Sequence, residues 1–347
     1  DRVTVTLRVD AARWRTHQDR VVGSTEGVVP VAKGNGYGFG LGLVLEECAR
    51  MFHERGVAMT AVGTYVESPI ALDRFPGDVL VLEPWRPSIH RDLAVIEHPR
   101  LVHTATSRSD LTELQGRNPA ARYVLEALTS MMRHGMSRMA LRGLVDAVGD
   151  DPRFLGVTAH LPLGTGHVDE VDAWMRSIPV DRWFVSHLAP EELRTLGDRF
   201  PGRVIRPRIG TRLWLGDETA FRVRAHVLDV HPVARGDRAG YRQRQLQGGT
   251  VVVLSGGTAH GIGLEAPSAA STMRQRGIAA AEGLLEAAGK IRSPFTVSGM
   301  RPAFVEPPHM QVSMVHLPPG VPAPQVGTEV DVRVRTTIFH PDVVVVS

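Results

Sequence analysis

Lys33 is the residue whose type and position most clearly favour chemistry. Residues 28–32 (Val-Val-Pro-Val-Ala) form an apolar stretch typical of a short buried strand, and glycine-rich residues follow it directly. The sequence therefore predicts a lysine at a strand end, where partial burial lowers the pKa of an ammonium group. A neutral amine attacks carbonyl carbons and forms a Schiff base. Of the 40 lysines and arginines only Lys33 and Lys290 are lysines, and arginine cannot form an imine, which favours a chemical use for Lys33.

A tyrosine and several glycines follow Lys33 at a regular spacing. The segment from Lys33 to Gly38 has the pattern Lys-x-x-x-Tyr-Gly, with Tyr37 as its tyrosine. This pattern resembles the cofactor-binding motif of the alanine racemase family, Lys-Ala-Asn-Ala-Tyr-Gly-His-Gly. The resemblance implies that Lys33 holds pyridoxal 5'-phosphate as a Schiff base and that Tyr37 contacts the phosphate of this cofactor.

Alternating strands and helices are predicted to position Lys33. The predicted strands are residues 28–32, 59–63, 78–82, 101–104, 121–125, 154–158, 183–186 and 203–206, with helical patterns between them such as 42–55 and 191–198. Strands separated by crossover helices predict a parallel (β/α)8 barrel, which we place at residues 10–215 as the pyridoxal-phosphate-binding domain. Chemistry in such barrels belongs to the loops that follow the strands, and Lys33 follows the first strand.

The pattern changes after residue 215. Strands without paired helices are predicted at residues 221–228, 249–254, 310–314 and 330–334, and residues 1–9 alternate between apolar and polar side chains. We therefore predict a mainly β domain made of residues 1–9 and 216–347. A helical insertion is expected near 265–295, with its helix at residues 271–290.

A second block that is similar to the alanine racemase family follows the fifth predicted strand. Residues 128–135 (Leu-Thr-Ser-Met-Met-Arg-His-Gly) match in part the family's Asp-Thr-Gly-Met-x-Arg-x-Gly. The resemblance implies that Arg133 contacts the phenolic oxygen of the cofactor and the substrate carboxylate, a task that suits a forked cation. Many family members carry a carbamylated lysine seven residues earlier, where this chain has Glu126. We hypothesise that the carboxylate of Glu126 orients Arg133 and so contributes to substrate binding.

Two further strand ends carry matches to the family. His160 matches the histidine after the sixth strand, and Arg206 matches the arginine that bonds the pyridine nitrogen of the cofactor. A guanidinium keeps its proton, so the ring nitrogen stays unprotonated, which favours plain isomerisation over side reactions. The backbone of Arg208 and Ile209 matches family contacts to the phosphate, although the family has glycine where Arg208 stands.

The β domain carries two more expected site residues. Tyr241 resembles the family's second catalytic base, which crosses the dimer interface, and His160 and Arg206 are expected to lower its pKa. Racemisation needs proton exchange on both faces of the α carbon, so Lys33 serves one face and Tyr241 of the partner subunit serves the other. Met314 matches the residue whose backbone amide meets the substrate carboxylate. The resemblance thus implies a homodimer with shared active sites.

The predicted substrate entrance departs from the family. Residues 256–260 (Gly-Gly-Thr-Ala-His) replace the family's Gly-Tyr-Ala-Asp-Gly, and residues 339–343 lack the usual tyrosine. Both family tyrosines narrow the entrance around alanine. We therefore expect a pyridoxal-phosphate-dependent racemase or epimerase that acts on an amino acid or amine-bearing metabolite larger than alanine.

Two alternatives to a racemase remain open at this point. A pyridoxal-phosphate decarboxylase of related architecture places a catalytic cysteine in its β domain, whereas Cys48 lies in the first barrel helix. A sensor or carrier that binds the cofactor without turnover is suggested by departures from the family at Ser130, Glu191, Gly257 and Val315. Exchange of solvent deuterium into the α carbon separates the second alternative from a racemase.

Composition argues against several other classes of protein. The formal net charge is only +3 and aromatic residues make up 5%, which is atypical of a nucleic-acid platform. A single cysteine excludes an internal disulfide and a thiolate metal cluster, and we expect no metal site. The sequence contains no apolar stretch long enough to span a bilayer and no signal peptide. These features favour a cytoplasmic enzyme.

Overall fold

A computed structural model of the chain describes residues 5–264 and 292–347. The helix expected at residues 271–290 lies outside the described residues. The chain divides into two compact units, which are treated separately below. Arg15–Gly36 and Leu41–Asp217 form the barrel unit, and Asp1–Trp14, Tyr37–Gly40 and Glu218–Ser347 form the β unit.

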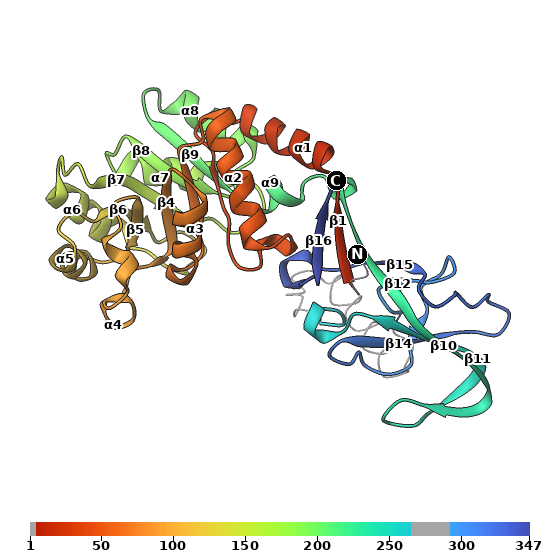
Figure 1. Ribbon diagram of the computed structural model, residues 1–347. Coiled ribbons are helices and arrows are strands. Elements are labelled where there is room, and N and C mark those ends of the chain that lie inside the picture. Colours follow the sequence, from red (N-terminus) through yellow and green to blue (C-terminus); the bar gives the residue numbers. More distant parts are fainter. Residues whose placement is uncertain (1–4, 265–291) are drawn as a thin grey trace. The chain divides into compact units, whose positions relative to one another are not determined.

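The barrel unit is built on an 8-stranded parallel sheet with the strand order β2-β9-β8-β7-β6-β5-β4-β3 (Figure 1). Its strands are β2 (Val29–Pro30), β3 (Met59–Val62), β4 (Asp78–Pro84), β5 (Leu101–Ala105), β6 (Arg122–Ala127), β7 (Phe154–Ala159), β8 (Arg182–Ser186) and β9 (Val204–Ile209). A parallel bridge between Val31 and Ala61 joins the two outer strands of this order. Each predicted strand overlaps an observed one, and the predicted (β/α)8 barrel is confirmed.

Helices cover the barrel sheet; the first of them precedes β2, and the others lie between or after the barrel strands. They are α1 (Ala11–Gly23), α2 (Leu41–Arg55), α3 (Ser68–Arg74), α4 (Pro87–His90), α5 (Arg108–Arg117), α6 (Arg138–Val148), α7 (Val168–Ser177), α8 (Pro190–Arg199) and α9 (Thr211–Leu215). Side-chain caps begin two of them: Ser107 accepts the Asp110 amide before α5, and Ser137 accepts the Ala140 amide before α6. Apolar side chains on α6 and α7, such as Leu141 and Val171, pack against the outward face of the strands.

A smaller apolar cluster fills the barrel interior. Val29, Met59, Val102 and Phe184 belong to it and are almost completely buried. Because parallel strands covered on both faces bury most of their side chains, these strands are continuous apolar runs in the sequence. That is why their positions are predictable from the sequence.

The β unit contains a second, largely antiparallel 8-stranded sheet with the central order β12-β15-β10-β11-β14-β13, while β1 pairs with both β10 and β16. Its strands are β1 (Val5–Val9), β10 (Phe221–Ala239), β11 (Arg244–Ser255), β12 (Phe295–Thr296), β13 (Ala303–Phe304), β14 (Val312–Leu317), β15 (Glu329–Val332) and β16 (Val343–Val346). The long strands β10 and β11 form a hairpin whose turn is residues 240–243. The predicted mainly β domain is confirmed.

Residues Tyr37–Gly40, which follow the Lys33 loop, belong to the β unit. Phe39 stacks on Trp14 with ring centroids 4.6 Å apart and meets Phe221 edge-on at 5.4 Å. Gly38 has a φ of +93°, and a Cβ there would lie 3.0 Å from the carbonyl oxygen of Thr336, so a larger residue does not fit. The glycine-rich sequence after Lys33 therefore serves packing within the β unit as well as the loop itself.

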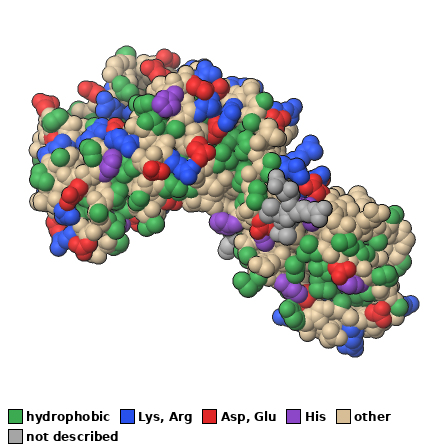
Figure 2. Space-filling model, in the orientation of Figure 1, with side chains coloured by type: hydrophobic (Ala, Val, Ile, Leu, Met, Phe, Trp, Pro, Cys, Tyr) green, Lys and Arg blue, Asp and Glu red, His purple; other side chains and the backbone are tan. Residues whose placement is uncertain are grey.

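Cationic and anionic side chains are intermixed over the visible surface (Figure 2). Many of them form ion pairs, for example Arg50 with Glu47 and with Asp19. No helix in the part of the chain that the structure describes is both long and apolar enough to cross a membrane.

Candidate active site

Lys33 lies just beyond β2, where the loops after β2 and β3 are tied together by one carboxylate. Glu67 accepts the backbone N–H of Gly34 at 2.6 Å through Oε1 and that of Gly63 at 2.6 Å through Oε2. A Cβ built on Gly63 would lie 3.2 Å from the Cβ of Lys33, so the two loops run close together. Glu67 therefore fixes the residue after Lys33 against the neighbouring loop that follows β3.

The electrostatic surroundings of Lys33 favour the neutral amine. Although the side chain is exposed in the single chain, neighbouring protein atoms displace enough water that desolvation is the main cause of a lowered pKa. The positive charges of Arg133 and Arg208 lower the pKa of Lys33 further, while Glu67 opposes them. Such an environment suits a lysine that acts as a nucleophile and as a proton carrier.

Arg208 and Glu126 form a buried charged centre at the carboxyl ends of β9 and β6. Arg208 is buried, its Nη2 donates to the carbonyl oxygen of Ala159 at 3.2 Å, and its Nε has no partner among the described residues. Glu126 is buried, and its Oε2 likewise lacks a partner in the described part of the chain. Burial raises the pKa of Glu126 to about 7, against the opposing effect of Arg208, and lowers the pKa of Arg208 to about 10. The centre thus has hydrogen-bonding capacity to spare for a polar ligand.

His160 follows β7 and is held by the end of β8. Its Nδ1 lies 2.9 Å from the hydroxyl of Ser186, and its ring meets that of His187 edge-on with centroids 5.2 Å apart. Burial, and after it the charges of Arg208 and Arg133, lower the pKa of His160 to about 2. The imidazole is therefore neutral at any physiological pH.

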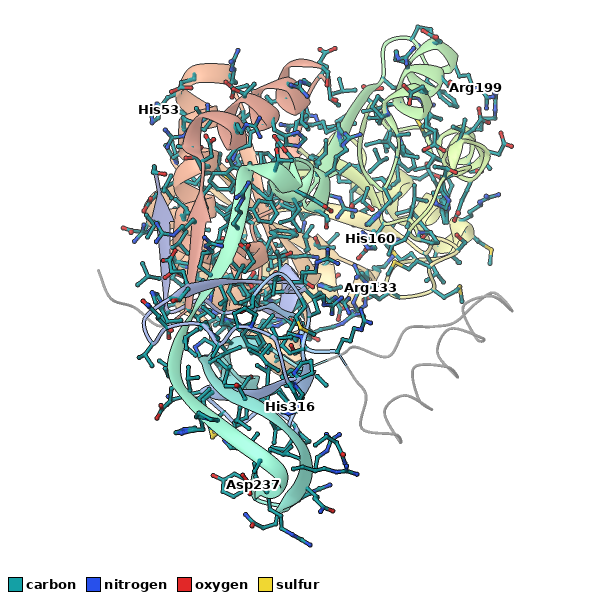
Figure 3. All side chains as sticks on the ribbon, turned by 90° about the vertical axis from the view of Figure 1, so that its right-hand side faces the viewer. His53, Arg133, His160, Arg199, Asp237 and His316 are labelled. Atoms are coloured by element: carbon teal, nitrogen blue, oxygen red, sulfur yellow. The ribbon has the colours of Figure 1, made fainter. Side chains whose placement is uncertain are left out.

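Arg133 lies in the loop between β6 and α6, on the same side of the barrel as His160 (Figure 3). The loop is anchored at both ends: the Met136 amide donates to the carbonyl of Glu126 at 2.8 Å, and Ser130 donates from its amide and its hydroxyl to Glu170, each at 2.6 Å. The charge of Arg133 influences the pKa of Lys33, His160 and Arg208.

The geometry shows no ion pair between Glu126 and Arg133 among the described residues. Of the charges that lower the pKa of Glu126, that of Arg208 has the largest effect and that of Arg133 follows. The carboxylate expected to orient Arg133 is thus coupled more strongly to Arg208.

Arg206 lies away from this cluster, contrary to the sequence-based expectation. Its Nε donates to the carbonyl of Gly27 at 3.4 Å, and its guanidinium lies 5.5 Å from the ring centroid of Phe184 inside the barrel. The charges that affect its pKa are those of Arg182 and Asp78, the first residues of β8 and β4. These contacts place Arg206 toward the amino-terminal ends of the strands, so Arg208 is the β9 arginine that reaches the site.

Comparison with known families identifies the barrel. A family model described as the N-terminal domain of alanine racemase matches residues 7–188, which is more than half of the chain. The chain belongs to the alanine racemase family. A search of curated proteins finds no match to it.

Solved structures of alanine racemases share the fold over the whole chain. The alanine racemase of Bartonella henselae, solved with covalently bound pyridoxal phosphate, is 16% identical with a TM-score of 0.71, and the match covers 97% of this chain and 96% of that one. The alanine racemase of E. faecalis is 17% identical with a TM-score of 0.70, and the match covers 99% of this chain and 98% of that one. A histidine racemase from Leuconostoc mesenteroides subsp. sake is 17% identical with a TM-score of 0.67, covering 99% and 98%. At these identities the likeness shows the fold alone.

Three of the residues expected at the site belong to the β unit. Tyr37 is buried and has a φ of +58°, Met314 lies in β14 paired with Val253, and Tyr241 lies in the turn of the β10–β11 hairpin. The remaining expected residues belong to the barrel unit, where Lys33, Glu126, Arg133, His160 and Arg208 form the cluster described above. Ile209 is buried inside β9, and its carbonyl accepts the amide of Val31 at 2.9 Å.

Several residues that shape the site were not expected from the sequence. Glu67 had a recognisable signal, because Thr64-x-x-Glu67 is the capping-box pattern and the structure contains that box. Ser186 and His187 lie at the end of a predicted strand, which is where site residues of such a barrel are expected. Glu306, which contacts Tyr241, carried no signal because the two are far apart in sequence.

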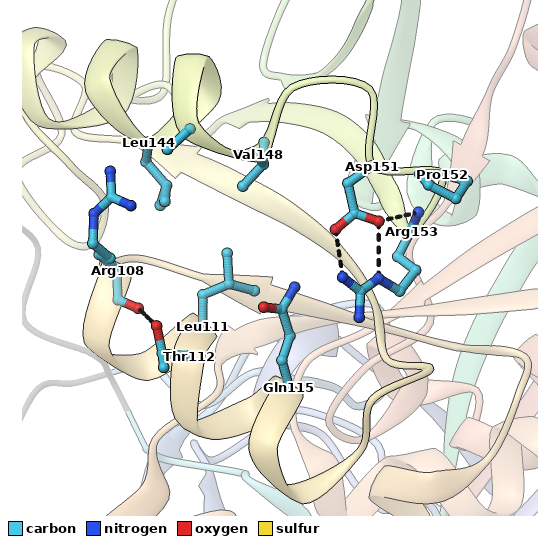
Figure 4. Close-up of a pocket in the computed structure, with 10 residues that line it drawn as sticks. Arg108, Leu111, Thr112, Gln115, Leu144, Val148, Asp151, Pro152 and Arg153 are labelled. Atoms are coloured by element: carbon cyan, nitrogen blue, oxygen red, sulfur yellow. Dashed lines mark hydrogen bonds and ion pairs between the residues drawn. The ribbon is translucent and has the colours of Figure 1, made fainter.

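A cavity of about 490 Å³ lies elsewhere, between α5 and α6 on the outer layer of the barrel unit (Figure 4). Arg108, Gln115 and the ion pair of Asp151 with Arg153 are among the residues that line it. None of the residues of the Lys33 cluster lines this cavity.

The barrel cluster fits pyridoxal phosphate. Lys33 has a lowered pKa, and Arg208 and Arg133 supply the positive charges near it. The Nε of Arg208 and the Oε2 of Glu126, which have no partner among the described residues, and the neutral His160 offer hydrogen bonds. A cationic set around a reactive amine suits a ligand that carries a phosphate and a carbonyl group. Among the residues that the structure describes, no group of three or more His, Cys, Asp or Glu side chains is arranged for a metal ion.

Proposed function

We propose that this chain is a pyridoxal-phosphate-dependent amino-acid racemase or epimerase that works as a homodimer. The observation that carries the proposal is the convergence of Lys33, Arg208, Arg133 and the neutral His160 at the carboxyl ends of the barrel strands. Membership of the alanine racemase family and a histidine racemase among the structural neighbours support it.

In this proposal Lys33 binds the cofactor and exchanges a proton on one face of the substrate's α carbon. When bound, pyridoxal phosphate supplies an electron-withdrawing ring that acidifies the α-C–H bond. Arg208 would donate to the pyridine nitrogen of the cofactor, the role that the sequence assigned to Arg206. Even with a pKa of about 10, its guanidinium stays protonated near neutral pH and therefore donates a hydrogen bond without giving up the proton.

Substrate orientation and the second proton transfer are assigned to other residues. Arg133, which remains exposed, binds the substrate carboxylate together with the backbone amide of Met314. Tyr241 of the partner subunit exchanges a proton on the opposite face of the α carbon. His160 cannot act as a cation, so it serves as a neutral hydrogen-bonding group held by Ser186.

The residues at the altered entrance positions favour a substrate larger than alanine. Gly257 stands where the family has its first entrance tyrosine, and a Cβ there would lie 2.0 Å from the carbonyl oxygen of His309, so no side chain fits. Phe339, in the segment that lacks the second tyrosine, is completely buried in the β unit, whereas a tyrosine that narrows an entrance must extend toward the substrate. We therefore propose that alanine is not the preferred substrate.

Decarboxylation is disfavoured by the state of the single cysteine. Cys48 is completely buried in α2, where it accepts a hydrogen bond from Thr60 at 3.5 Å, and burial raises the pKa of its thiol to about 12. Such a thiol stays protonated at neutral pH, is a weak acid and is closed off from solvent, so it is a poor proton donor to a substrate.

The first test is the absorption spectrum of the purified chain with pyridoxal phosphate. We expect a visible band in the wild type and in Lys290→Ala, the other lysine of the chain, but not in Lys33→Ala. Absence of the band from the wild type refutes the cofactor assignment.

The second test follows deuterium incorporation at the α carbon in D2O, with alanine, histidine and longer amino acids offered in both enantiomers. Incorporation with inversion supports a racemase, while a visible band without incorporation supports a sensor or carrier. A clear preference for alanine contradicts the proposed larger substrate.

A further inference from the structure

A buried carboxylate lies beneath the turn of the β10–β11 hairpin in the β unit. The side chain of Glu306 is only 7% exposed. Its Oε2 accepts the backbone N–H of Tyr241 at 2.8 Å, and its Oε1 lies 2.7 Å from Nε2 of His309. Because both carboxylate oxygens have partners, Glu306 links the hairpin turn to the segment before β14 in one orientation.

The hairpin turn is shaped to receive this carboxylate. Gly240 has a φ of +76°, and a Cβ at this position would lie 2.5 Å from the carboxyl group of Glu306, so only glycine permits the approach. Gln243 closes the turn by donating from its amide to the carbonyl of Gly240 at 3.1 Å. Arg244 donates to the carbonyls of Phe304 at 3.1 Å and Val305 at 3.2 Å, which ties the same segment to β11.

Tyr241 is exposed and yet constrained. Tyr241 is 85% exposed, and its ring centroid lies 4.7 Å from that of His309 at an interplanar angle of 37°. An exposed tyrosine usually samples several rotamers, and ordering it at the moment of binding costs entropy. Here the backbone bond to Glu306 and the ring of His309 order it in advance. The hairpin turn lies near Asp237, at the far end of β10 (Figure 3).

We infer that Glu306 and His309 are positioning residues for Tyr241. They hold the hairpin turn and the tyrosine ring so that the phenol meets the active site of a second copy of this chain in a geometry fit for proton transfer. This inference rests on the proposed function, in which Tyr241 of the partner subunit is the second base. Neither residue touches the substrate, so their loss acts on proton transfer only through Tyr241.

The first test observes Tyr241 directly in the full chain and needs no turnover. The chain has only 4 tyrosines, so ring-labelled tyrosine gives few NMR signals, and the signal lost in Tyr241→Phe identifies Tyr241. We expect cross-peaks between the Tyr241 and His309 rings in the wild type. In Glu306→Ala these cross-peaks should vanish, and the Tyr241 signal should move toward that of a free tyrosine.

A conservative variant separates positioning from a general loss of folding. Glu306→Gln keeps an oxygen that accepts the Tyr241 amide and an amide group that donates to His309, so it should retain the cross-peaks. His309→Phe keeps a ring against Tyr241 but loses the bond to Glu306, and an intermediate result is expected. Unchanged Tyr241 signals in both Glu306→Ala and His309→Phe overturn the inference.

The second test measures deuterium uptake from each enantiomer of alanine and of histidine in D2O. The enantiomer whose α proton faces Lys33 exchanges without Tyr241, whereas the other enantiomer depends on it. Misplacing a reacting group costs up to about 100-fold in rate. We expect Glu306→Ala to slow uptake from the Tyr241-dependent enantiomer by about 10- to 100-fold, with less than about 3-fold change for the other and recovery in Glu306→Gln.

The outcomes distinguish the inference from the proposed function. Equal slowing of both enantiomers, with the Lys33-dependent band intact, refutes a positioning role confined to Tyr241. A wild-type chain that shows the band but exchanges no amino acid refutes the proposed function instead. In that case the NMR comparison alone decides whether Glu306 and His309 hold Tyr241.

Discussion

Replacing Glu126 by glutamine is expected to stabilise the folded chain above neutral pH. Glu126 is buried, and burial outweighs the favourable charges of Arg208 and Arg133, so the pKa of its carboxyl rises from 4.5 to about 7. Ionisation of Glu126 is therefore harder in the folded chain than in the unfolded chain. Glutamine has nearly the same shape and carries no charge, so it avoids this penalty.

The pH window and the size of the effect follow from the same pKa. Between pH 4.5 and about 7 the folded state binds more protons than the unfolded state, so the contribution of Glu126 to stability falls as pH rises through this window. One pKa unit corresponds to about 1.4 kcal/mol. A rise from 4.5 to about 7 thus makes Glu126→Gln more stable than the wild type by up to about 3 kcal/mol at pH 8, and by close to zero at pH 4.5.

Urea unfolding followed by tryptophan fluorescence measures this difference for the barrel unit. Trp85, Trp174, Trp183 and Trp214 lie in that unit, and only Trp14 lies in the other. The lowered pKa of His160 makes stability rise with pH in the wild type, but it is common to both proteins and cancels in their difference.

An exposed glutamate provides the control for this experiment. Glu113→Gln removes a carboxylate that pairs with Arg91 at the surface, and it should change stability by no more than about 1 kcal/mol at either pH. If Glu126→Gln is instead less stable than the wild type at pH 8, the two arginines outweigh burial, and the reasoning from desolvation is wrong.

Two further substitutions test the cationic cluster. Arg208→Gln should weaken pyridoxal phosphate binding at least about 10-fold in an absorption titration, because it removes a buried charge-assisted donor, whereas Arg206→Gln should change the affinity by less than about 3-fold. Equal losses in both variants contradict the assignment to Arg208. Glu67→Gln removes an anion that raises the pKa of Lys33, so the pH at which the Lys33-dependent band titrates should move downward. An upward shift shows that the backbone contacts of Glu67, and not its charge, govern the pKa of that amine.

Most of the fold is predictable because buried parallel strands are short apolar runs at regular intervals. The eight strands were placed correctly to within a few residues, and the helices at 41–55 and 190–199 match their predicted positions closely. The tie between Glu67 and Gly34, or between Glu306 and Tyr241, is not predictable in this way. Such contacts join residues that are distant in sequence, so the local periodicity of apolar residues does not predict them.

Sequence motifs predict some residues of the site but not others. His160 follows β7 directly, and Lys33 and Arg133 lie in the loops after β2 and β6, so locating the strand ends locates the loops that carry these residues. Glu126 was expected to orient Arg133 because the family carries a negatively charged residue at this spacing before the arginine. Spacing along the sequence does not show which side chains enter the barrel interior. There the charge of Arg208, from β9, lowers the pKa of Glu126 more than the charge of Arg133 does.

The displacement of Arg206 by Arg208 follows from the geometry of a strand. Residues two apart point to the same face, and they lie about 7 Å apart along the strand. β9 pairs Arg206 with Phe184 and Arg208 with Ser186, the residue that holds His160. Aligning the family's arginine with Arg208 in place of Arg206 therefore keeps the side chain on the same face of β9. It moves the charge toward the carboxyl ends of the strands.

The same two-residue shift of the alignment applies to the expected phosphate contacts. Arg208 and Ile209 lie within β9, where they pair with Val29 and Pro30, so their positions are those of strand residues. Moving the motif by two places the corresponding contacts at Gly210 and Thr211, the first residues beyond the strand. We propose that these residues contact the phosphate. One shift of register then accounts both for the arginine at the site and for the glycine that the family places next to the phosphate.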